Sequence, residues 1–268
     1  MSRAAIALGV AGSPVCIHAG PGSFADVDGG GAAVVVGFLA VDCTVVVPTF
    51  TPSLEVVPPP PALRPRRNGV VYERMEVRDA RRAFDPAGND VDPGAGGVAE
   101  EVLAMPTRRR GAHPLLSFTA VGPEADAMIV GQSPEDVYAP LDAVARSRGA
   151  VVLAGCGLSS MTLLHAAERD AGRAPFVRAA RVAGRGVIGA RVAGCARGFD
   201  NLRPVVEPFS NDHQLGATML RSFGARSALD AASFAIRRDR RLTRCHLEEC
   251  LSCEDAIAGG PIGPLRLV

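Results

Sequence analysis

Three residues in the segment LSSMTLLHAAERD (158–170) are of types that could move a proton: Thr162, His165 and Glu168. Residues three apart on an α-helix lie on adjacent turns, so these side chains would form a slanted row on one face. A carboxylate beside an imidazole stabilises the protonated ring and orients it, as a general base requires. The same spacing is also typical of an ordinary helical histidine paired with a glutamate. The residues alone leave both interpretations open.

A second candidate is the turn Gly155-Cys156-Gly157, which follows a buried strand and precedes a helix. Such turns direct backbone N–H groups and a helix N-terminus towards an anion such as a pyrophosphate. Ser160 stands where a dinucleotide-binding motif would have its third glycine, and no acidic residue ends a second strand. A tight strand-to-helix turn is therefore as well supported as a nucleotide site.

A third candidate is the group Cys245, His246, Cys250 and Cys253 near the C-terminus. Three thiolates and one imidazole could ligate zinc, but zinc knuckles usually separate their ligand pairs by a longer loop. The chain has seven cysteines, an odd number, which favours reduced thiols over a disulfide framework. Incidental reduced thiols are therefore favoured and no metal is expected, while the sequence leaves open whether Cys245, Cys250 and Cys253 bind one.

The elements that must position these residues alternate along the chain. The apolar, β-branched stretches 15–20, 44–52, 115–122 and 150–157 predict strands, and 30–40, 99–105, 124–131 and 161–172 predict helices. Because the strands are continuously apolar, a sheet covered on both faces and an α/β class are expected. His18 is predicted to cap the turn after the first strand. The Pro-rich stretch 57–69 predicts a surface excursion, and 181–194, with RVAG twice, a Gly-turned hairpin.

Composition narrows the function classes. The net charge is +1, aromatic residues are 4% and tryptophan is absent, which argues against nucleic-acid binding. Every basic residue is arginine, which excludes Schiff-base or P-loop lysine chemistry. No apolar stretch reaches the ~18–20 residues of a membrane span, and the N-terminus lacks a secretion signal, so a cytoplasmic protein is expected. We expect one domain over 1–268 with a peripheral Arg- and Cys-rich tail over 236–268.

Taken in order, several stretches resemble motifs of the aminoglycoside 3-N-acetyltransferase family, the antibiotic N-acetyltransferases. They run collinearly from about residue 5 to 235. The stretches are IHAGPGSFADVDGGGAAVV (17–35), PTFT (48–51), GVAE (97–100), RGAHPLLSFTAVG (110–122), VVLAGCGLSSMTLLHAAE (151–168), CARGF (195–199) and LGATMLRSFGARSALDAA (215–232). The resemblance implies a central mixed β-sheet flanked by helices, unlike the Gcn5-type acetyltransferase fold.

The resemblance also implies acetyl-CoA as cosubstrate and transfer to the 3-amine of a 2-deoxystreptamine aminoglycoside, which would confer antibiotic resistance. His165 would be the general base, with Glu168 as its acidic partner and Thr162 in the same motif. Two further sets of residues are assigned to ligands. The CoA set is Gly20, Ser23, Arg110, His113 and Ser117, and the acceptor set is Thr49 and Glu100, with Asp170 and Glu207 added because a polycationic acceptor favours an acidic cleft.

The chain departs from the family pattern where ligands would bind. Ala19-Gly20 replaces the usual pair of serines, Gly111 replaces a serine, and the stretch 209–216 is shortened. Three alternatives therefore stay open: an acetyltransferase for another small-molecule amine, a degenerate CoA-binding homologue without turnover, and a nucleotide-binding protein. We expect no nucleic-acid or membrane partner, and the sequence leaves a homodimer open.

Overall fold

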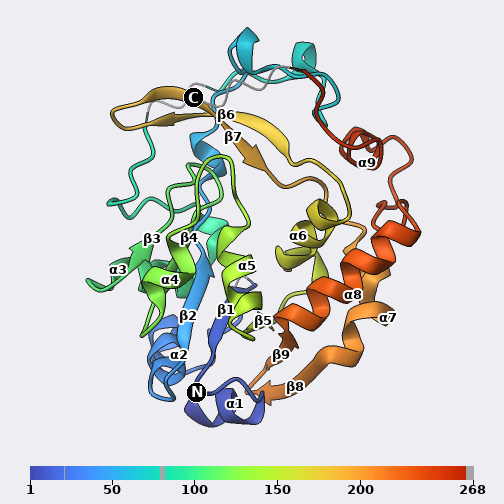
Figure 1. The fold of residues 1–268 in the computed structure, drawn as a ribbon. Coiled ribbons are helices and arrows are strands. Elements are labelled where there is room, and N and C mark those ends of the chain that lie inside the picture. The colour runs from blue at the N-terminus through green and yellow to red at the C-terminus, as the bar shows by residue number, and fades with distance from the viewer. Residues whose placement is uncertain (21, 79–81, 264–268) are drawn as a thin grey trace.

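The computed structural model describes residues 1–20, 22–78 and 82–263. In this part of the chain the main sheet has seven strands in the order β3-β4-β2-β1-β5-β9-β8 (Figure 1). They are β1 (Pro14–Ala19), β2 (Thr44–Pro48), β3 (Arg109–Arg110), β4 (Phe118–Val121), β5 (Ala150–Ala154), β8 (Ser210–Leu215) and β9 (Thr218–Gly224). Strand β1 is parallel to β2 and β5, and the other neighbours are antiparallel. The predicted mixed sheet is confirmed.

Side chains alternate between the two faces of the sheet along each strand, and both faces are buried because helices pack against each of them. Cys16 and Val46 belong to one apolar core, and Val15 and Val45 to the other. The first core includes residues of α4 (Ala125–Ile129), α5 (Ala139–Arg146), α6 (Leu163–Asp170), α7 (Arg203–Val206) and α8 (Ala225–Arg238). The second includes residues of α1 (Ser2–Ala7), α2 (Gly30–Leu39) and α3 (Gly97–Ala104). This confirms the α/β class and explains the continuously apolar strands.

The carboxyl ends of β1, β2 and β5 meet at one edge of the sheet. The chain passes from β1 through α2 to β2 on one side of β1, whereas β5 lies on the other side. The crevice where neighbouring parallel connections diverge is the usual ligand site of open α/β sheets. Helix α6 follows β5 after a short turn, so its first residues start at this edge.

A two-stranded hairpin, β6 (Phe176–Val182) and β7 (Gly186–Val192), stands beyond that edge (Figure 1). It confirms the hairpin predicted over 181–194, although β6 begins earlier. Phe176 and Ala180 share a small apolar core with Leu54, Phe84 and Leu115.

The irregular segment between β2 and α3 packs against this hairpin. Val56 N–H donates to the Ala179 carbonyl at 2.8 Å, and the Asn68 amide bridges the backbone N–H and carbonyl of Val177, both at 2.8 Å. The Pro-rich stretch is thus partly anchored to β6, not simply a surface excursion.

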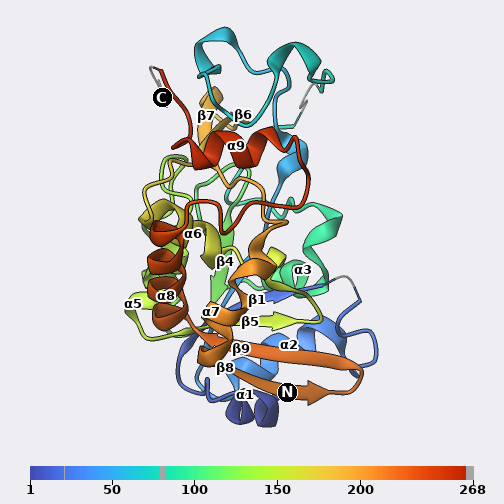
Figure 2. The same cartoon turned by 90° about the vertical axis from the view of Figure 1, so that its right-hand side faces the viewer.

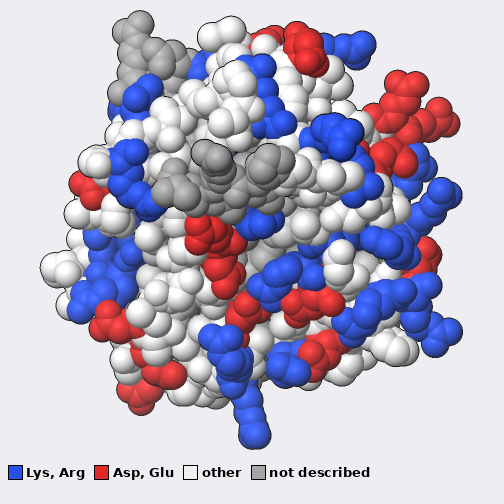
Figure 3. Space-filling view, turned by 45° about the horizontal axis from the view of Figure 1, so that its top comes forward, with Lys and Arg blue, Asp and Glu red and all other residues white. Residues whose placement is uncertain are grey.

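The C-terminal segment passes beside α8 and ends in α9 (Leu251–Ile257), close to the hairpin (Figure 2). The expectation of a peripheral tail is wrong for part of 236–268, because Thr243, Cys245 and Cys253 are buried. Residues 264–268 of that tail lie outside the described residues. None of the helices in the described ranges has the length and apolarity to cross a membrane. On the face in Figure 3, arginine side chains lie among aspartates and glutamates.

Candidate active site

His165 and Glu168 form a buried pair on α6. The imidazole Nδ1 and the carboxylate Oε2 are 2.8 Å apart, and only 6% of His165 and 8% of Glu168 is exposed. The ring of Phe199 packs against the imidazole with centroids 4.5 Å apart. Because the carboxylate accepts from Nδ1–H, the lone pair of the neutral imidazole is on Nε2. No described residue forms a hydrogen bond with Nε2.

The other oxygen of the Glu168 carboxylate is held from two directions. Oε1 accepts hydrogen bonds from Arg173 and from the Thr243 hydroxyl, the latter at 2.7 Å. Burial by itself raises the pKa of a carboxyl, but here the hydrogen bond and charge of His165 and the charge of Arg173 outweigh it. The pKa of Glu168 therefore lies below its ordinary value. Glu168 is ionised and can stabilise a protonated His165.

A cavity of about 360 Å³ opens where the parallel strands end. Its walls are contributed by the ends of β1 and β2, the loop before α3, the turn before α6, and α6 itself. Its lining residues include His18, Ala19, Phe50, Asp92, Thr162 and His165. This arrangement places a histidine with one free nitrogen, backed by a buried carboxylate, beside a space that fits a small molecule.

Several residues predicted to bind ligands hold the protein together instead. The Arg110 guanidinium donates to Ser117 Oγ at 3.1 Å and to the carbonyls of Gly88, Thr49 and Asp90 at 3.0, 3.0 and 2.6 Å. Thr49 is fully buried, with its hydroxyl 2.8 Å from that of Thr119. Successive side chains of an extended segment point in opposite directions. Pro48 and Phe50 therefore line the cavity, whereas Thr49 points away from it.

His113 is also structural. Its Nδ1 accepts from the N–H groups of Leu115 and Leu116 at 3.2 and 2.8 Å, so its Nε2–H donates to the Arg191 carbonyl at 2.6 Å. The residue is fully buried and ties the start of β4 to the end of β7. The polar atoms of Arg110, His113, Ser117 and Thr49 are thus engaged within the protein, and these residues support the scaffold around the cavity.

Gly20 and Ser23 do border an open space. A second cavity of about 210 Å³ is lined by the turn residues 19, 20 and 22–25, by Gly31 and by the start of α3, and shares Ala19 with the first. A side chain at Gly20 would bring its Cβ within 2.8 Å of the Gly155 carbonyl, so this turn needs glycine. The Ser23 hydroxyl points inward, 2.7 Å from each of the carbonyls of Gly20 and Ala154, and therefore shapes the turn.

The acidic residues predicted to line the cleft are elsewhere. Glu100, Asp170 and Glu207 are exposed and do not line this cavity. Asp170 pairs with Arg169 at 2.7 Å, and Glu207 is 3.7 Å from Arg221. The carboxylate that lines the cavity is Asp92, which accepts from Ser53 N–H at 2.9 Å. Sequence reasoning missed Asp92 because its loop has no periodic pattern.

Arg173, Thr243 and His18 were also missed. Arg173 is one of many arginines, and Thr243 lies 75 residues from its partner Glu168, so spacing could not reveal either. His18 lies within β1, not in a turn, and lines the same cavity as His165. Phe199, which packs against His165, belongs to the CARGF stretch, and this motif was the one sequence feature that pointed to it.

Because two histidines are buried, we expect the free energy of unfolding to depend on pH. Burial lowers the pKa of His18 and of His113 to about 4, from 6.5. Between these values the unfolded chain binds protons that the folded chain does not, so the folded state is favoured fully above pH 6.5 and loses stability as pH falls towards 4. The expected loss is roughly 3 kcal/mol per histidine by pH 4. Urea unfolding over this range measures it, and a flat profile would contradict it.

Thr243→Val should destabilise the site without changing its shape. The hydroxyl donates to Glu168 Oε1 and accepts from Arg173 at 2.6 Å, and it is 2% exposed. Leaving buried polar partners unsatisfied typically costs about 1–3 kcal/mol. Equilibrium urea unfolding should show that loss, whereas Thr243→Ser, which keeps the hydroxyl, should stay near wild type. Equal stability of the two variants would show that the hydroxyl contributes nothing.

The fold and the site define a class: a mixed α/β protein with a carboxylate-backed histidine at the carboxyl ends of its parallel strands. The sequence profile of the aminoglycoside 3-N-acetyltransferases matches residues 16–234. The chain therefore belongs to the aminoglycoside 3-N-acetyltransferase family.

Individual relatives match shorter segments. The aminoglycoside N(3)-acetyltransferase VIII of Streptomyces fradiae is 38% identical over 101 residues, 37% of this chain and 35% of that protein. The N(3)-acetyltransferase IV of Salmonella sp is 39% identical over 88 residues, 32% and 33% of the two chains. The matched segments thus span about a third of the length of these curated relatives.

Solved structures share the fold over nearly the whole chain. The aminoglycoside acetyltransferase AAC(3)-IVa apoenzyme superposes with a TM-score of 0.73 at 21% identity, covering 96% of this chain and 95% of that one. The YokD protein from Bacillus subtilis superposes with a TM-score of 0.66 at 21% identity, covering 89% and 98%. At these identities the likeness establishes the fold.

Proposed function

We propose that this protein transfers the acetyl group of acetyl-CoA to the 3-amino group of a 2-deoxystreptamine aminoglycoside. The observation that carries the proposal is His165, whose Nδ1 is bound to Glu168 while its ring lines the cavity at the strand ends. Family membership supplies the reaction class. Related solved structures add that AAC-IIIb was obtained with CoASH and AAC(3)-IVa, as a histidine-to-alanine mutant, with a gentamicin and with apramycin.

The acceptor attacks as the neutral amine, its ammonium proton having passed to solvent, because an ammonium has no lone pair with which to attack a thioester. A base is then needed because the nitrogen must lose a further proton as it becomes an amide. Nε2 of His165 takes a proton from the acceptor amine as its nitrogen bonds to the thioester carbonyl carbon. Glu168 stabilises the resulting imidazolium. The Thr162 hydroxyl, which lines the cavity, donates to the oxyanion that develops. The C–S bond then breaks, the imidazolium returns a proton to the sulfur, and CoA and the amide leave.

The donor would enter through the second cavity. The turn residues 19, 20 and 22–25 and the start of α3 border that space, which adjoins the His165 cavity at Ala19. A thioester arm laid along this turn would meet mostly backbone and small side chains, since Ser23 donates inward. The proposed cosubstrate contacts are therefore at Ala19, Gly20 and Gly22, not at Arg110, His113 or Ser117.

The direct test follows the acetylated product by mass spectrometry with acetyl-CoA and gentamicin or apramycin. Product detection is preferable to a thiol reagent for released CoA, because this chain has free cysteines of its own. NMR of the product should place the acetyl group on the 3-amine. Failure to acetylate any 2-deoxystreptamine compound would refute the proposed acceptor.

A second candidate acceptor is a less cationic small-molecule amine. The cavity that His165 lines has one carboxylate, Asp92, among the described residues. A cavity with several carboxylates would attract a polycationic acceptor more strongly. An acceptor screen with uncharged and singly charged amines separates the two, since acetylation confined to such amines would favour this candidate. Stabilisation by CoA with no turnover on any amine would instead indicate a binding protein.

A further inference from the structure

Four cysteine thiols lie together beside the candidate active site. The Sγ atoms of Cys195, Cys245, Cys250 and Cys253 are all within 4.8 Å of one another. Four sulfurs bound to one zinc ion at ~2.3 Å in a regular tetrahedron would be about 3.8 Å apart. The sulfurs are therefore almost in place for an ion at their centre. We propose that this group is a structural zinc site with four thiolate ligands.

The backbone around the group suits a metal. Cys195 follows β7, Cys250 caps the N-terminus of α9, and Cys253 lies one turn into that helix. The Cys245 N–H donates to Cys253 Sγ at 3.5 Å, which fixes the position of this sulfur in the group. Cys245 and Cys253 are buried, while Cys195 and Cys250 are half-buried. The site is thus closed on its inner side, as structural zinc sites usually are.

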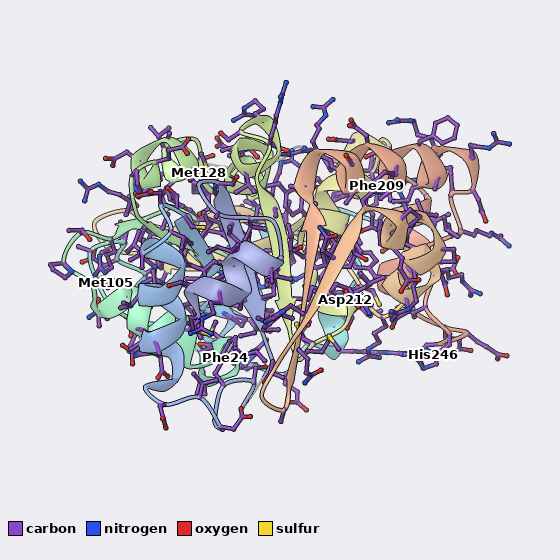
Figure 4. The ribbon with its side chains drawn as sticks, turned by 90° about the horizontal axis from the view of Figure 1, so that it is seen from below. Phe24, Met105, Met128, Phe209, Asp212 and His246 are labelled. Carbon is purple, nitrogen blue, oxygen red and sulfur yellow. The ribbon has the colours of Figure 1, made fainter. Side chains whose placement is uncertain are left out.

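The fourth ligand differs from what the sequence suggested. His246 is the nearest neighbour of Cys245 in sequence, but it is exposed and lies at the outer edge of the molecule (Figure 4). Cys195, 50 residues earlier, takes that place in the cluster. Spacing within the tail could not predict a ligand from a distant loop. The proposed zinc site replaces our expectation that the chain has no metal site.

Zinc would connect the tail to the catalytic pair. The stretch 239–250 between α8 and α9 is irregular, yet it supplies the Thr243 hydroxyl to Glu168 and the Arg240 carbonyl to Arg173. A small cavity is lined by Glu168, Arg173 and Thr243 together with Cys195 and Cys253. The cluster would clamp this stretch two residues from Thr243, and so hold the second oxygen of Glu168 in place. The thiols would release their protons to solvent on binding the ion.

The first experiment measures metal in the protein as purified, without a chelator. About one zinc per chain is expected, and replacing zinc with Co²⁺ should give the strong visible absorption of a tetrahedral cobalt thiolate. Wild-type protein that contains no zinc and takes up neither Zn²⁺ nor Co²⁺ under reducing conditions would overturn the proposal. So would iron in place of zinc, or disulfides that link these cysteines in freshly purified protein.

Matched variants identify the ligands. Cys195→Ser and Cys250→Ser should lose most of the zinc, whereas His246→Ala and Cys156→Ser, which alter residues outside the cluster, should keep it. Loss of zinc from His246→Ala with retention in Cys195→Ser would contradict the assignment. These readouts need no enzymatic activity, so the zinc site stands or falls separately from the proposed acetyl transfer.

Discussion

His165→Ala is expected to lower kcat for acetyl transfer by about 10²–10⁴-fold, the usual contribution of a positioned general base. The reason is that Nε2 is the one ring nitrogen left free, since Nδ1 is occupied by Glu168 at 2.8 Å. KM for either substrate should change little, because in the proposed mechanism the imidazole acts on the amine in the transition state and does not hold the acceptor. Initial rates at saturating acetyl-CoA, followed by product mass spectrometry, measure the effect.

A histidine outside the site provides the control. His213 lies on the edge strand β8, and His213→Ala should keep wild-type turnover. Far-ultraviolet circular dichroism should show that both variants are folded. If His165→Ala retains near wild-type kcat, His165 is not the base and the proposed mechanism is wrong.

Glu168→Gln is expected to reduce both turnover and stability. The substitution keeps the size of the side chain but removes the charge that stabilises the His165 imidazolium, so kcat should fall by about 10²-fold or more. It also leaves Arg173, 5% exposed, without its buried counter-ion. Removing one member of a buried ion pair costs about 3–5 kcal/mol. Urea unfolding and steady-state kinetics measure the two effects.

Asp170→Asn is the matched control for this change. It removes a carboxylate from the last residue of the same helix, where the side chain is exposed and pairs with Arg169. Its effect on stability should be within about 1 kcal/mol, as for most surface ion pairs, and turnover should be unaffected. Equal losses in both variants would show that helix charge, not the buried network, is responsible.

Much of the fold could be predicted because it depends on local patterns. The apolar runs at 15–20, 44–52 and 150–157 each became a central strand, and two faces of buried residues followed from their continuity. The edge strand β8 and its neighbour β9 were harder to predict. β8 is polar rather than apolar, and it contains His213, which we had no reason to place in a sheet.

In the candidate site, too, the residues that local spacing predicts differ from those that only tertiary packing brings together. His165, Glu168 and Thr162 lie within one helical stretch, where spacing of three gives neighbouring side chains, and the structure brings the first two into contact. Arg173 and Thr243 complete the network through tertiary packing, which spacing does not encode. Arg110 and Thr49 belong to matching motifs but serve the scaffold. A motif position does not by itself separate ligand contact from support.

The proposed transfer requires acetyl-CoA and His165 to meet in one place, and a crystal structure of the protein with CoA and an aminoglycoside tests this most directly. We expect the CoA sulfur in the cavity at the carboxyl ends of β1, β2 and β5, with the 3-amine of the acceptor within hydrogen-bonding distance of His165 Nε2. A sulfur bound on another face of the sheet, or an acceptor amine facing away from His165, would contradict it.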